Sequence, residues 1–269
     1  MMAPVAKAGR FSISFIEVMC SMSKPILYVF LISHYCEKAR WALDYCGVDY
    51  KLKVLSPIEY RKKAESIGAK SSALPILQLE DEVIQGSAEI IAWSNAKALE
   101  EGRQGLILNE ESIAIEKRLD DVLGVHVRRW FYSEALLDCP EIVLPVFSKG
   151  SGFIKRLLIK AAWPTVVRFM IKGMDLGPTQ EQESKEIVLK ELDWLDSLLS
   201  DSTDYLCGNS LSNADIAAAS LMAPMISPPT HPASDVMSLP PRVAATAIEL
   251  SERPFAKWVS ALYLNRNAN

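Results

Sequence analysis

The sequence contains few of the residues that build metal sites and disulfide frameworks. Only three histidines occur among its 269 residues, which argues against a histidine-rich metal site. The five cysteines are odd in number and none stands in a C-x-x-C pair, so neither a disulfide framework nor a cysteine-based zinc site is expected. These absences predict a protein without a metal cofactor in a reducing compartment, which favours the cytoplasm.

The chain also lacks a large excess of charge of one sign and a long apolar run. Its 29 basic and 33 acidic residues give a formal net charge of -4, which offers no general attraction for nucleic acid. The longest uncharged stretch of the second half, residues 216–234, contains four prolines and a histidine, whereas a membrane-spanning helix needs about 20 mostly apolar residues. We therefore expect no nucleic-acid partner and no membrane span. The apolar share of 49% indicates instead a large helical core and a buried dimer face.

The first 24 residues differ in composition from the rest. Lys7, Arg10 and several serines precede the first acidic residue, Glu17, and the apolar run is too short and broken for a secretory signal. One interpretation is a weak targeting peptide for the mitochondrion or plastid. The other, which we favour, is an N-terminal extension over residues 1–24 that is disordered or that precedes a true start at Met22.

Residues 26–55 alternate between strand and helix patterns. An apolar run at 26–32 has the length of a strand that is buried on both faces. Apolar residues then fall at helical spacing as far as Gly47, a natural helix stop, and residues 49–55 alternate as a second strand. This order predicts a βαβ unit, whose strands are normally parallel with a right-handed crossover.

The next segment predicts a short helix and a hairpin. Residues 57–72 are polar and basic, and we expect a short helix followed by a loop. Residues 74–85 predict two strands around a tight turn at Glu80-Asp81, and Ser87 is expected to cap a helix that ends near residue 100. The resulting βαβ-αββα order is thioredoxin-like, and we predict such a domain over residues 25–100.

The residue pattern after residue 107 predicts only helices and loops. The expected helices cover residues 109–137, 153–173 with an interruption at Pro164, 181–200, a segment that begins at Ser212, and about 241–264. The fold class is therefore α/β plus all-α. A thioredoxin-like domain is followed by a short linker at 100–104 and by a helical-bundle domain over residues 107–269.

The expected helix at 153–173 mixes basic and apolar side chains. A helix of this composition can lie on a membrane surface. It can also pack within the second domain with its basic face in water. We favour the packed helix.

Four short motifs occur in order along the chain. They are Ser33-His34-Tyr35-Cys36, Ala73-Leu74-Pro75-Ile76-Leu77, Gln85-Gly86-Ser87-Ala88-Glu89-Ile90 and Leu206-Cys207-Gly208-Asn209-Ser210-Leu211-Ser212-Asn213-Ala214-Asp215-Ile216. Each stands on the expected element, the first where a strand turns into a helix. In this order and at these intervals they resemble the motifs of the soluble, cytosolic-type glutathione S-transferase superfamily in its serine-type form. The resemblance covers residues 25–216.

The resemblance implies a role for the residues of the first three motifs. Ser33 matches the catalytic serine, which acts on the thiol of the co-substrate glutathione. Pro75 matches a proline that is cis in this family, and the backbone of Leu74 before it would pair with the cysteinyl part of glutathione like an added strand. Gln85 and Ser87 are expected to hold the γ-glutamyl carboxylate at a helix N-terminus, where anions bind readily.

The fourth motif resembles a capping motif of the helical domain. Ser212 is the expected N-cap and Asp215 its reciprocal partner, in an aspartate form of the capping box. The resemblance therefore implies that these two residues stabilise the fold and take no part in the chemistry.

Three features depart from the family pattern. Gly86 replaces the acidic residue that usually precedes the serine of the third motif. The position directly before Leu74 carries no lysine, and Lys70 or Lys63 would instead reach the glycyl carboxylate. Residues 139–178 form a longer connection than in compact relatives.

The residue types of the first motif suit the chemistry of a thiol. A free thiol has a pKa of about 8.5 and only its thiolate is nucleophilic. A hydroxyl that donates to the sulfur and the positive end of a helix both favour the thiolate, and Ser33 can provide both. Alternatively, Ser33 only caps the helix. Cys36 either forms a mixed disulfide with glutathione or faces the core, and we favour the core. His34 and Tyr35 could line the cleft, although a histidine that faces the solvent is the commoner case.

We therefore predict an enzyme, a homodimer, that conjugates glutathione to a hydrophobic electrophilic small molecule. One alternative is a glutathione-dependent reductase or isomerase, although thiol transfer would need a cysteine where Ser33 stands. Another is a non-catalytic binding protein on the same fold, which Gly86 favours. The identity of the electrophilic substrate depends on side chains of the second domain. The aromatic residues 130–132 there are mostly core candidates, and some of them would face the cleft.

Overall fold

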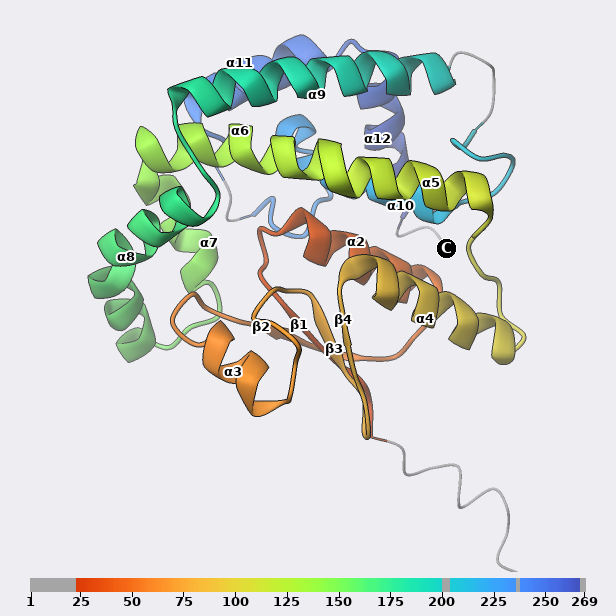
Figure 1. Cartoon of the computed structure of the whole chain (residues 1–269), viewed down its shortest axis with the longest axis horizontal. Coiled ribbons are helices and arrows are strands. Elements are labelled where there is room, and N and C mark those ends of the chain that lie inside the picture. The colour runs from red at the N-terminus through yellow and green to blue at the C-terminus, as the bar shows by residue number, and fades with distance from the viewer. Residues whose placement is uncertain (1–22, 200–203, 236–237, 267–269) are drawn as a thin grey trace, which may run out of the picture.

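The computed structural model describes residues 23–199, 204–235 and 238–266. Almost all of the expected N-terminal extension, residues 1–22, lies outside the described residues. The first part of the chain forms a mixed sheet with helices (Figure 1). Its elements are β1 (Ile26–Val29), α2 (His34–Tyr45), β2 (Lys51–Val54), α3 (Tyr60–Ser66), β3 (Ile76–Gln78), β4 (Val83–Gln85) and α4 (Ser87–Glu100).

The four strands lie in the order β2-β1-β3-β4. β1 and β2 are parallel, β3 is antiparallel to β1, and β4 is antiparallel to β3. Successive side chains of a strand point to opposite faces, so Leu27 and Val29 pack towards α2 and α4, whereas Tyr28 packs against Ala64 of α3. The predicted thioredoxin-like arrangement is confirmed, with a first strand that ends at Val29 and not at residue 32.

The rest of the chain is helical, as predicted. Its elements are α5 (Glu110–Arg118), a π turn (Leu119–Leu123), α6 (Gly124–Leu137), a short 3-10 turn (Pro140–Ile142), α7 (Leu144–Ser148), α8 (Phe153–Gly173), α9 (Pro178–Leu199), α10 (Asn213–Ile226), α11 (Pro241–Leu250) and α12 (Pro254–Asn265). The expected helix at 109–137 is thus continuous but contains a π turn. None of the helices in the described part of the chain is long and apolar enough to cross a membrane.

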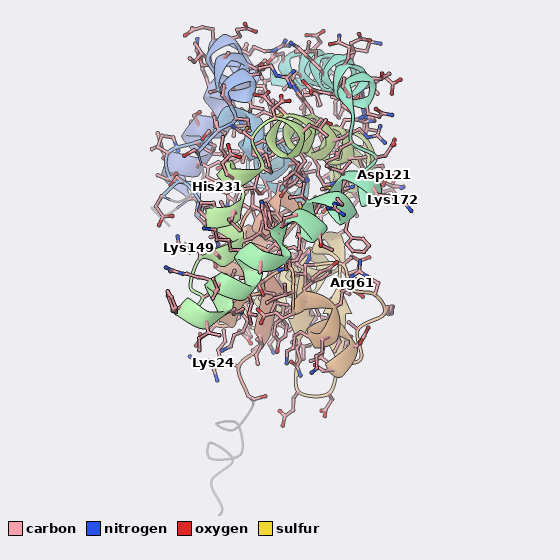
Figure 2. The ribbon with its side chains drawn as sticks, turned by 90° about the vertical axis from the view of Figure 1, so that its left-hand side faces the viewer. Lys24, Arg61, Asp121, Lys149, Lys172 and His231 are labelled. Carbon is pink, nitrogen blue, oxygen red and sulfur yellow. The ribbon has the colours of Figure 1, made fainter. Side chains whose placement is uncertain are left out.

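Two expectations about the helices are wrong. The predicted helix at 241–264 is two helices, because α11 ends at Leu250 and Pro254 is the first residue of α12, a position that suits proline and favours extended backbone at the residue before it. Arg253 accordingly has φ -67 and ψ 142. The predicted interruption at Pro164 does not occur, since α8 continues through this proline. Figure 2 shows α8 across the front of the molecule, on its outer side.

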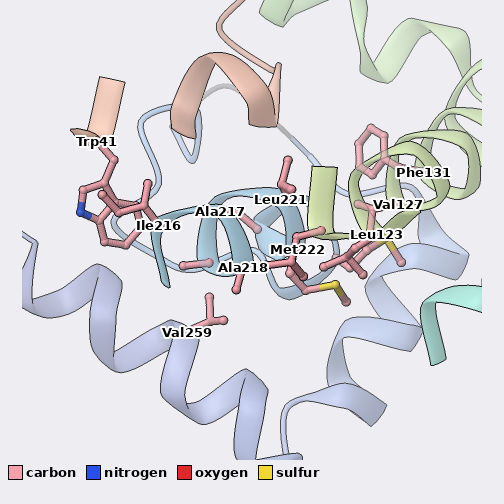
Figure 3. Packing of buried hydrophobic residues seen from close by; sticks show 14 of the residues in the cluster. Trp41, Leu123, Val127, Phe131, Ile216, Ala217, Ala218, Leu221, Met222 and Val259 are labelled. Carbon is pink, nitrogen blue, oxygen red and sulfur yellow. The ribbon is translucent and has the colours of Figure 1, made fainter. Parts of the chain in front are cut away.

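α2 lies between the sheet and the helical part of the chain. Its Cys36, Ala39 and Leu43 pack with the strands. Its opposite face packs against α10, and Trp41 there belongs to the largest hydrophobic cluster together with residues of α6, α10 and α12. Figure 3 shows Trp41 beside Ile216 at one end of this cluster. The two parts of the chain therefore share one core across α2.

The Ser212 cap of α10 is confirmed. The Asp215 backbone N–H donates to Ser212 Oγ (3.2 Å), and the Asp215 carboxylate accepts from the backbone N–H groups of Ser212 (2.7 Å) and Leu206 (2.7 Å). Both residues of this capping box are fully buried. The carboxylate also fixes the chain before the helix, because Leu206 lies nine residues before Asp215.

Lys38 of α2 links the thioredoxin-like part of the chain to the helical part through buried ion pairs. Its ammonium group lies 2.7 Å from Asp120 Oδ1, 2.6 Å from Asp120 Oδ2 and 2.7 Å from Glu116 Oε1. The lysine is fully buried. Glu116 also accepts a hydrogen bond from the side-chain amide of Asn213 (2.5 Å). One cation of the sheet side thus neutralises two carboxylates of the helical side.

We predict that Lys38→Met destabilises the protein by about 3–5 kcal/mol, because it leaves two partly or fully buried carboxylates without a cation. The matched control is Lys117→Met, which breaks the exposed Lys117–Asp121 pair (2.5 Å) and should cost less than about 1 kcal/mol. Urea unfolding of both variants at neutral pH measures the difference. Equal stabilities of the two variants would contradict this role of Lys38.

Candidate functional site

The residues expected to bind glutathione meet at one edge of the sheet. β1 runs towards Ser33 and ends beside the start of β3, since Tyr28 pairs with Ile76 in antiparallel register. β4 ends at the same edge, because Ile76 also pairs with Gln85. The backbone N–H of Gly86 donates to the Pro75 carbonyl at 3.2 Å. The topology therefore brings Ser33, Leu74–Pro75, Gln85 and Ser87 to one edge.

Ser33 is the N-cap of α2. Its backbone is extended (φ -79, ψ 118), and its Oγ accepts a long hydrogen bond of 3.4 Å from the backbone N–H of Cys36. The side chain is half-buried. A hydroxyl has one donor hydrogen in addition to its acceptor lone pairs, so accepting the cap bond leaves a hydrogen to donate. Ser33 can thus serve as a cap and as a donor at the positive end of α2.

Cys36 faces the core, as the favoured interpretation held. It is 1% exposed and packs with Leu27, Val29 and Ala39 under the sheet. Burial raises the pKa of the Cys36 thiol to about 11, although the neighbouring Ser33 hydroxyl opposes this shift. The thiol therefore stays neutral and enclosed near pH 7, which is unlike a reactive cysteine.

Gln85 holds the loop that leads into Leu74–Pro75. Its side-chain Nε2 donates to the carbonyl oxygens of Ser71 (2.8 Å) and Ala73 (2.7 Å), and its Oε1 accepts from the Ser71 backbone N–H (3.0 Å). The bond between Leu74 and Pro75 is cis. Both ends of the Gln85 amide are engaged by this loop, a positioning role that the sequence did not indicate. The direct contact between Gln85 and a ligand stays a prediction.

The start of α4 differs from the expectation at Ser87. The N-cap is Gly86, with φ 113 and ψ 146, and Ser87 is the first helical residue. A positive φ of this size is adopted readily only by glycine, which explains why the cap precedes the serine. The Glu89 carboxylate folds back into the space that a Cβ on Gly86 would occupy. An acidic group therefore stands beside the helix N-terminus, although it comes from the residue two positions after Ser87.

Behind Ser33 lies a small cavity between the two parts of the chain. Its volume of about 10 Å³ is room for one water-sized group. The lining residues are Ile32, His34, Arg128, Phe131, Tyr132 and Pro224. Trp130, Phe131 and Tyr132 of α6 are all buried in the core as expected, and the latter two also line the cavity. That part of them faces a substrate cleft stays a prediction.

The place of the cavity depends on a close contact between α2 and α6. The Tyr35 hydroxyl donates to the Asp120 carbonyl at 2.7 Å, within the π turn. It passes so close to Gly124 that a Cβ there would come 2.5 Å from the Tyr35 oxygen. The glycine at the start of α6 is therefore required by this approach of the two helices.

His34 is buried, which corrects the expectation that leaves it in water. It is 5% exposed, and burial followed by the nearby Arg128 guanidinium lowers its pKa to about 3. Its Nε2 and the Nε of Arg128 have no hydrogen-bond partner among the described residues. The cavity is thus lined by two polar nitrogen groups beside aromatic rings. The sequence carries no local signal for the burial of His34, because the residues of α6 that cover it lie about 95 positions later.

The long connection over residues 139–178 returns to the sheet edge. Phe147 of α7 packs edge-on against Phe30, with ring centroids 5.6 Å apart. Lys155 of α8 forms an ion pair of 2.6 Å with Glu59, just before α3. Figure 1 shows α7 and α8 beside α3 at this end of the molecule. The insertion therefore lies next to the end of β1 and the loop that carries Ser33.

The two lysines expected at the glycyl carboxylate are both near the surface. Lys63 is half-buried with its Nζ 5.0 Å from the centre of the Tyr28 ring, and Lys70 is exposed. Their contact with a ligand stays a prediction. Within residues 23–199, 204–235 and 238–266, no group of three or more His, Cys, Asp or Glu side chains is placed to hold a metal ion.

Comparison with known proteins agrees with this geometry. Residues 27–101 match the family model described as the glutathione S-transferase N-terminal domain. A glutathione transferase of Phanerochaete chrysosporium superposes with a TM-score of 0.60 at 13% identity, over 92% of this chain and 98% of that one. The chain has the fold of the glutathione S-transferase superfamily. The expected superfamily is thereby confirmed, and the family model spans the first three motifs.

Two further solved structures with this fold are similar along most of the chain. A glutathione S-transferase of Ceriporiopsis subvermispora, solved in complex with glutathione, has a TM-score of 0.58 at 14% identity, over 91% of this chain and 98% of that one. Glutaredoxin 2 of Salmonella typhimurium, also in complex with glutathione, has a TM-score of 0.52 at 19% identity, over 90% and 100%. No curated protein matches the sequence.

We predict that His34 makes the folded protein sensitive to mild acid. Its folded pKa of about 3 lies below the ordinary value of 6.5, so only the unfolded chain takes up a proton as the pH falls below 6.5. Stability present above this pH is then lost at about 1.4 kcal/mol per pH unit. From pH 7 to pH 5 the loss from His34 should be roughly 2 kcal/mol by the same relation.

The measurement is urea unfolding of the wild type and of His34→Gln at both pH values. The neutral glutamine removes this titration, so the variant should lose less stability between pH 7 and pH 5, whatever its stability at pH 7. His231, whose pKa is also lowered by burial, is present in both proteins and cancels in the comparison. The same pH dependence in both proteins would contradict a neutral, buried His34.

Proposed function

We propose that the protein is a serine-type glutathione transferase that conjugates glutathione to a hydrophobic electrophile. The observation that carries this proposal is the contrast within the first turn of α2. Ser33 presents a half-buried hydroxyl at the positive end of the helix, whereas the Cys36 thiol is enclosed in the core with a raised pKa. The group available to a substrate thiol is therefore the hydroxyl.

In this proposal Ser33 donates a hydrogen bond to the sulfur of glutathione and stabilises the thiolate. A hydrogen bond to the charged form lowers a pKa, and so does the nearby helix N-terminus. The backbone of Leu74 would align the cysteinyl part, since its N–H and C=O make no hydrogen bond within the described part of the chain. Two neighbours of similar fold hold glutathione in their structures, which supports this choice of ligand.

The γ-glutamyl end would bind at the start of α4. Its carboxylate would meet the helix N-terminus at Ser87, where unpaired N–H groups and the helix dipole favour an anion. Its ammonium group would meet Glu89, whose carboxylate stands over Gly86. Glu89 would thus compensate for the acidic residue that the family pattern places before the serine. Gln85 acts in this arrangement by holding the loop at residues 71–73.

A reductase or isomerase is the second candidate, favoured by the similarity in fold to a glutaredoxin. Thiol transfer, however, needs a reactive cysteine at the helix N-terminus. Position 33 is a serine, and Cys36 is buried. The transferase therefore remains the proposal that these residues favour.

We predict that Ser33→Ala lowers turnover with a generic electrophile by about 10- to 100-fold and leaves the Kd for glutathione nearly unchanged. One hydrogen bond to a charged group contributes roughly 1.5–3 kcal/mol, and each 1.36 kcal/mol is about tenfold in rate. The pKa of the bound thiol, followed by ultraviolet titration, should rise in this variant.

The matched variant is Glu89→Gln, which should weaken the binding of glutathione and leave the thiol chemistry unchanged. Glu89 is exposed, so its loss should weaken glutathione binding by only about two- to fivefold and leave the pKa of the bound thiol unchanged. Cys36→Ala serves as the control that changes neither quantity. If Cys36→Ala abolished activity while Ser33→Ala did not, the protein would act through thiol exchange and the proposal would be wrong.

We also propose that the domain of residues 25–100 and the domain of residues 107–269 pair with those of a second copy as a homodimer. The apolar share of 49% supports a buried interface, which in obligate dimers has an area of about 2,000 Å² or more. Sedimentation equilibrium at micromolar concentration should give twice the chain mass of 29.9 kDa. A particle with the mass of one chain would contradict the dimer.

A further inference from the structure

α8 exposes much of its apolar surface. Five large apolar residues of this helix are between 56% and 83% exposed. They are Phe153, Ile154, Leu157, Leu158 and Phe169. Only two residues of its 21, Ile159 and Trp163, are buried. α8 packs on the second domain as expected, through Trp163 and the partly buried Val166 and Met170. The expectation that only its basic face lies in water is wrong, because large apolar residues are exposed as well.

The exposed apolar residues share one side of α8. Residues three and four apart lie on the same face of a helix, which groups Ile154 with Leu157 and Leu158. The opposite side attaches the helix to the protein through Trp163, whose indole N–H donates to the Pro140 carbonyl at 3.1 Å. Figure 2 shows α8 at the front, with no other helix drawn over it. The apolar side therefore faces away from the protein.

The same helix carries charge of only one sign. It contains five basic residues and no acidic residue, although the whole chain has a formal net charge of -4. Lys155 pairs with Glu59. The other four are exposed and form no ion pair within the described part of the chain: Arg156, Lys160, Arg168 and Lys172. A partner of this face must therefore combine an apolar interior with negative charge at its surface.

We propose that α8 docks the protein on an anionic lipid membrane, with the helix lying in the plane of the interface. Exposed Phe and Leu residues would enter the boundary between headgroups and acyl chains, and Lys and Arg would meet the lipid phosphates. The surplus of acidic residues elsewhere in the chain is repelled by the same surface, which orients α8 towards it.

A second copy of the chain fits this face less well. A two-fold symmetric interface places the same patch of both subunits against each other, so the basic residues of one α8 would face those of the other. Like charges opposed across an interface are unfavourable. A lipid surface meets the same residues with negative charge.

The test is sedimentation of the full chain with lipid vesicles of two compositions. One set contains phosphatidylcholine alone, and the other contains phosphatidylcholine with phosphatidylserine. We expect binding to the anionic vesicles that weakens with added salt, and much weaker binding to the neutral ones. Each basic residue near an anionic surface contributes about fivefold in partitioning, so Arg168→Gln/Lys172→Gln should lower binding by about 30-fold.

The apolar contribution is tested by Phe153→Ser/Leu157→Ser, which should lower binding at least about tenfold, because the two side chains no longer enter the lipid. Both are exposed, so the fold should tolerate the change. The matched controls are Ile248→Ser on α11, an apolar residue 74% exposed, and Lys190→Gln on α9, an exposed basic residue. Neither control should change vesicle binding.

Any of these results would overturn the proposal. One is no binding to either type of vesicle. Another is equal binding to neutral and anionic vesicles. Another is equal loss of binding in the α8 variants and in the controls. The last is dissociation of a lipid-free dimer by the α8 variants, which would assign this face to a second copy of the chain.

Discussion

The buried ammonium group of Lys38 joins the helix that carries Ser33 to the helical half of the molecule. It neutralises Glu116 and Asp120 from inside α2, at distances of 2.6–2.7 Å. An unpaired charge at such a site would be strongly unfavourable, so the three groups fix one another's positions. The Tyr35 hydroxyl adds a bond to the Asp120 carbonyl at 2.7 Å. Through α2, the position of Ser33 depends on the helical half.

This connection explains why the cavity behind Ser33 is built from both halves. His34 comes from α2, whereas Arg128, Phe131 and Tyr132 come from α6, directly after the π turn that contains Asp120. On the other face of α2 the strands enclose Cys36, whereas Ser33 before the helix stays half-buried. The division between an inert thiol and an available hydroxyl is therefore a consequence of how α2 is held between the sheet and α10.

The features predicted from sequence are those encoded by residues close together in the chain. The strands, the βαβ unit and the Ser212–Asp215 capping box depend on periodicity or on residues three positions apart, and these were confirmed. The break at Pro254 also had a local signal, which was missed. The fold class followed from the order of these local elements.

The features that could not be predicted depend on contacts between distant residues. Gln85 holds a loop 12 to 14 residues before it, and nothing in the motif distinguishes this from a contact with ligand. The burial of His34 requires α6. The fold-back of Glu89 is a local contact, and it depends on the absence of a Cβ at Gly86. The composition of α8 indicated an amphipathic helix, but the sequence could not show that few other elements cover its apolar side.

We propose that the sheet edge formed by Ser33, Leu74–Pro75 and Ser87 binds glutathione. The most direct test of this proposal is chromatography of the purified, folded protein on immobilised glutathione, with a cooperative thermal transition as the check of folding. We expect the protein to be retained on the column and to be released by free glutathione. A folded protein that passes through the column without retention would contradict it.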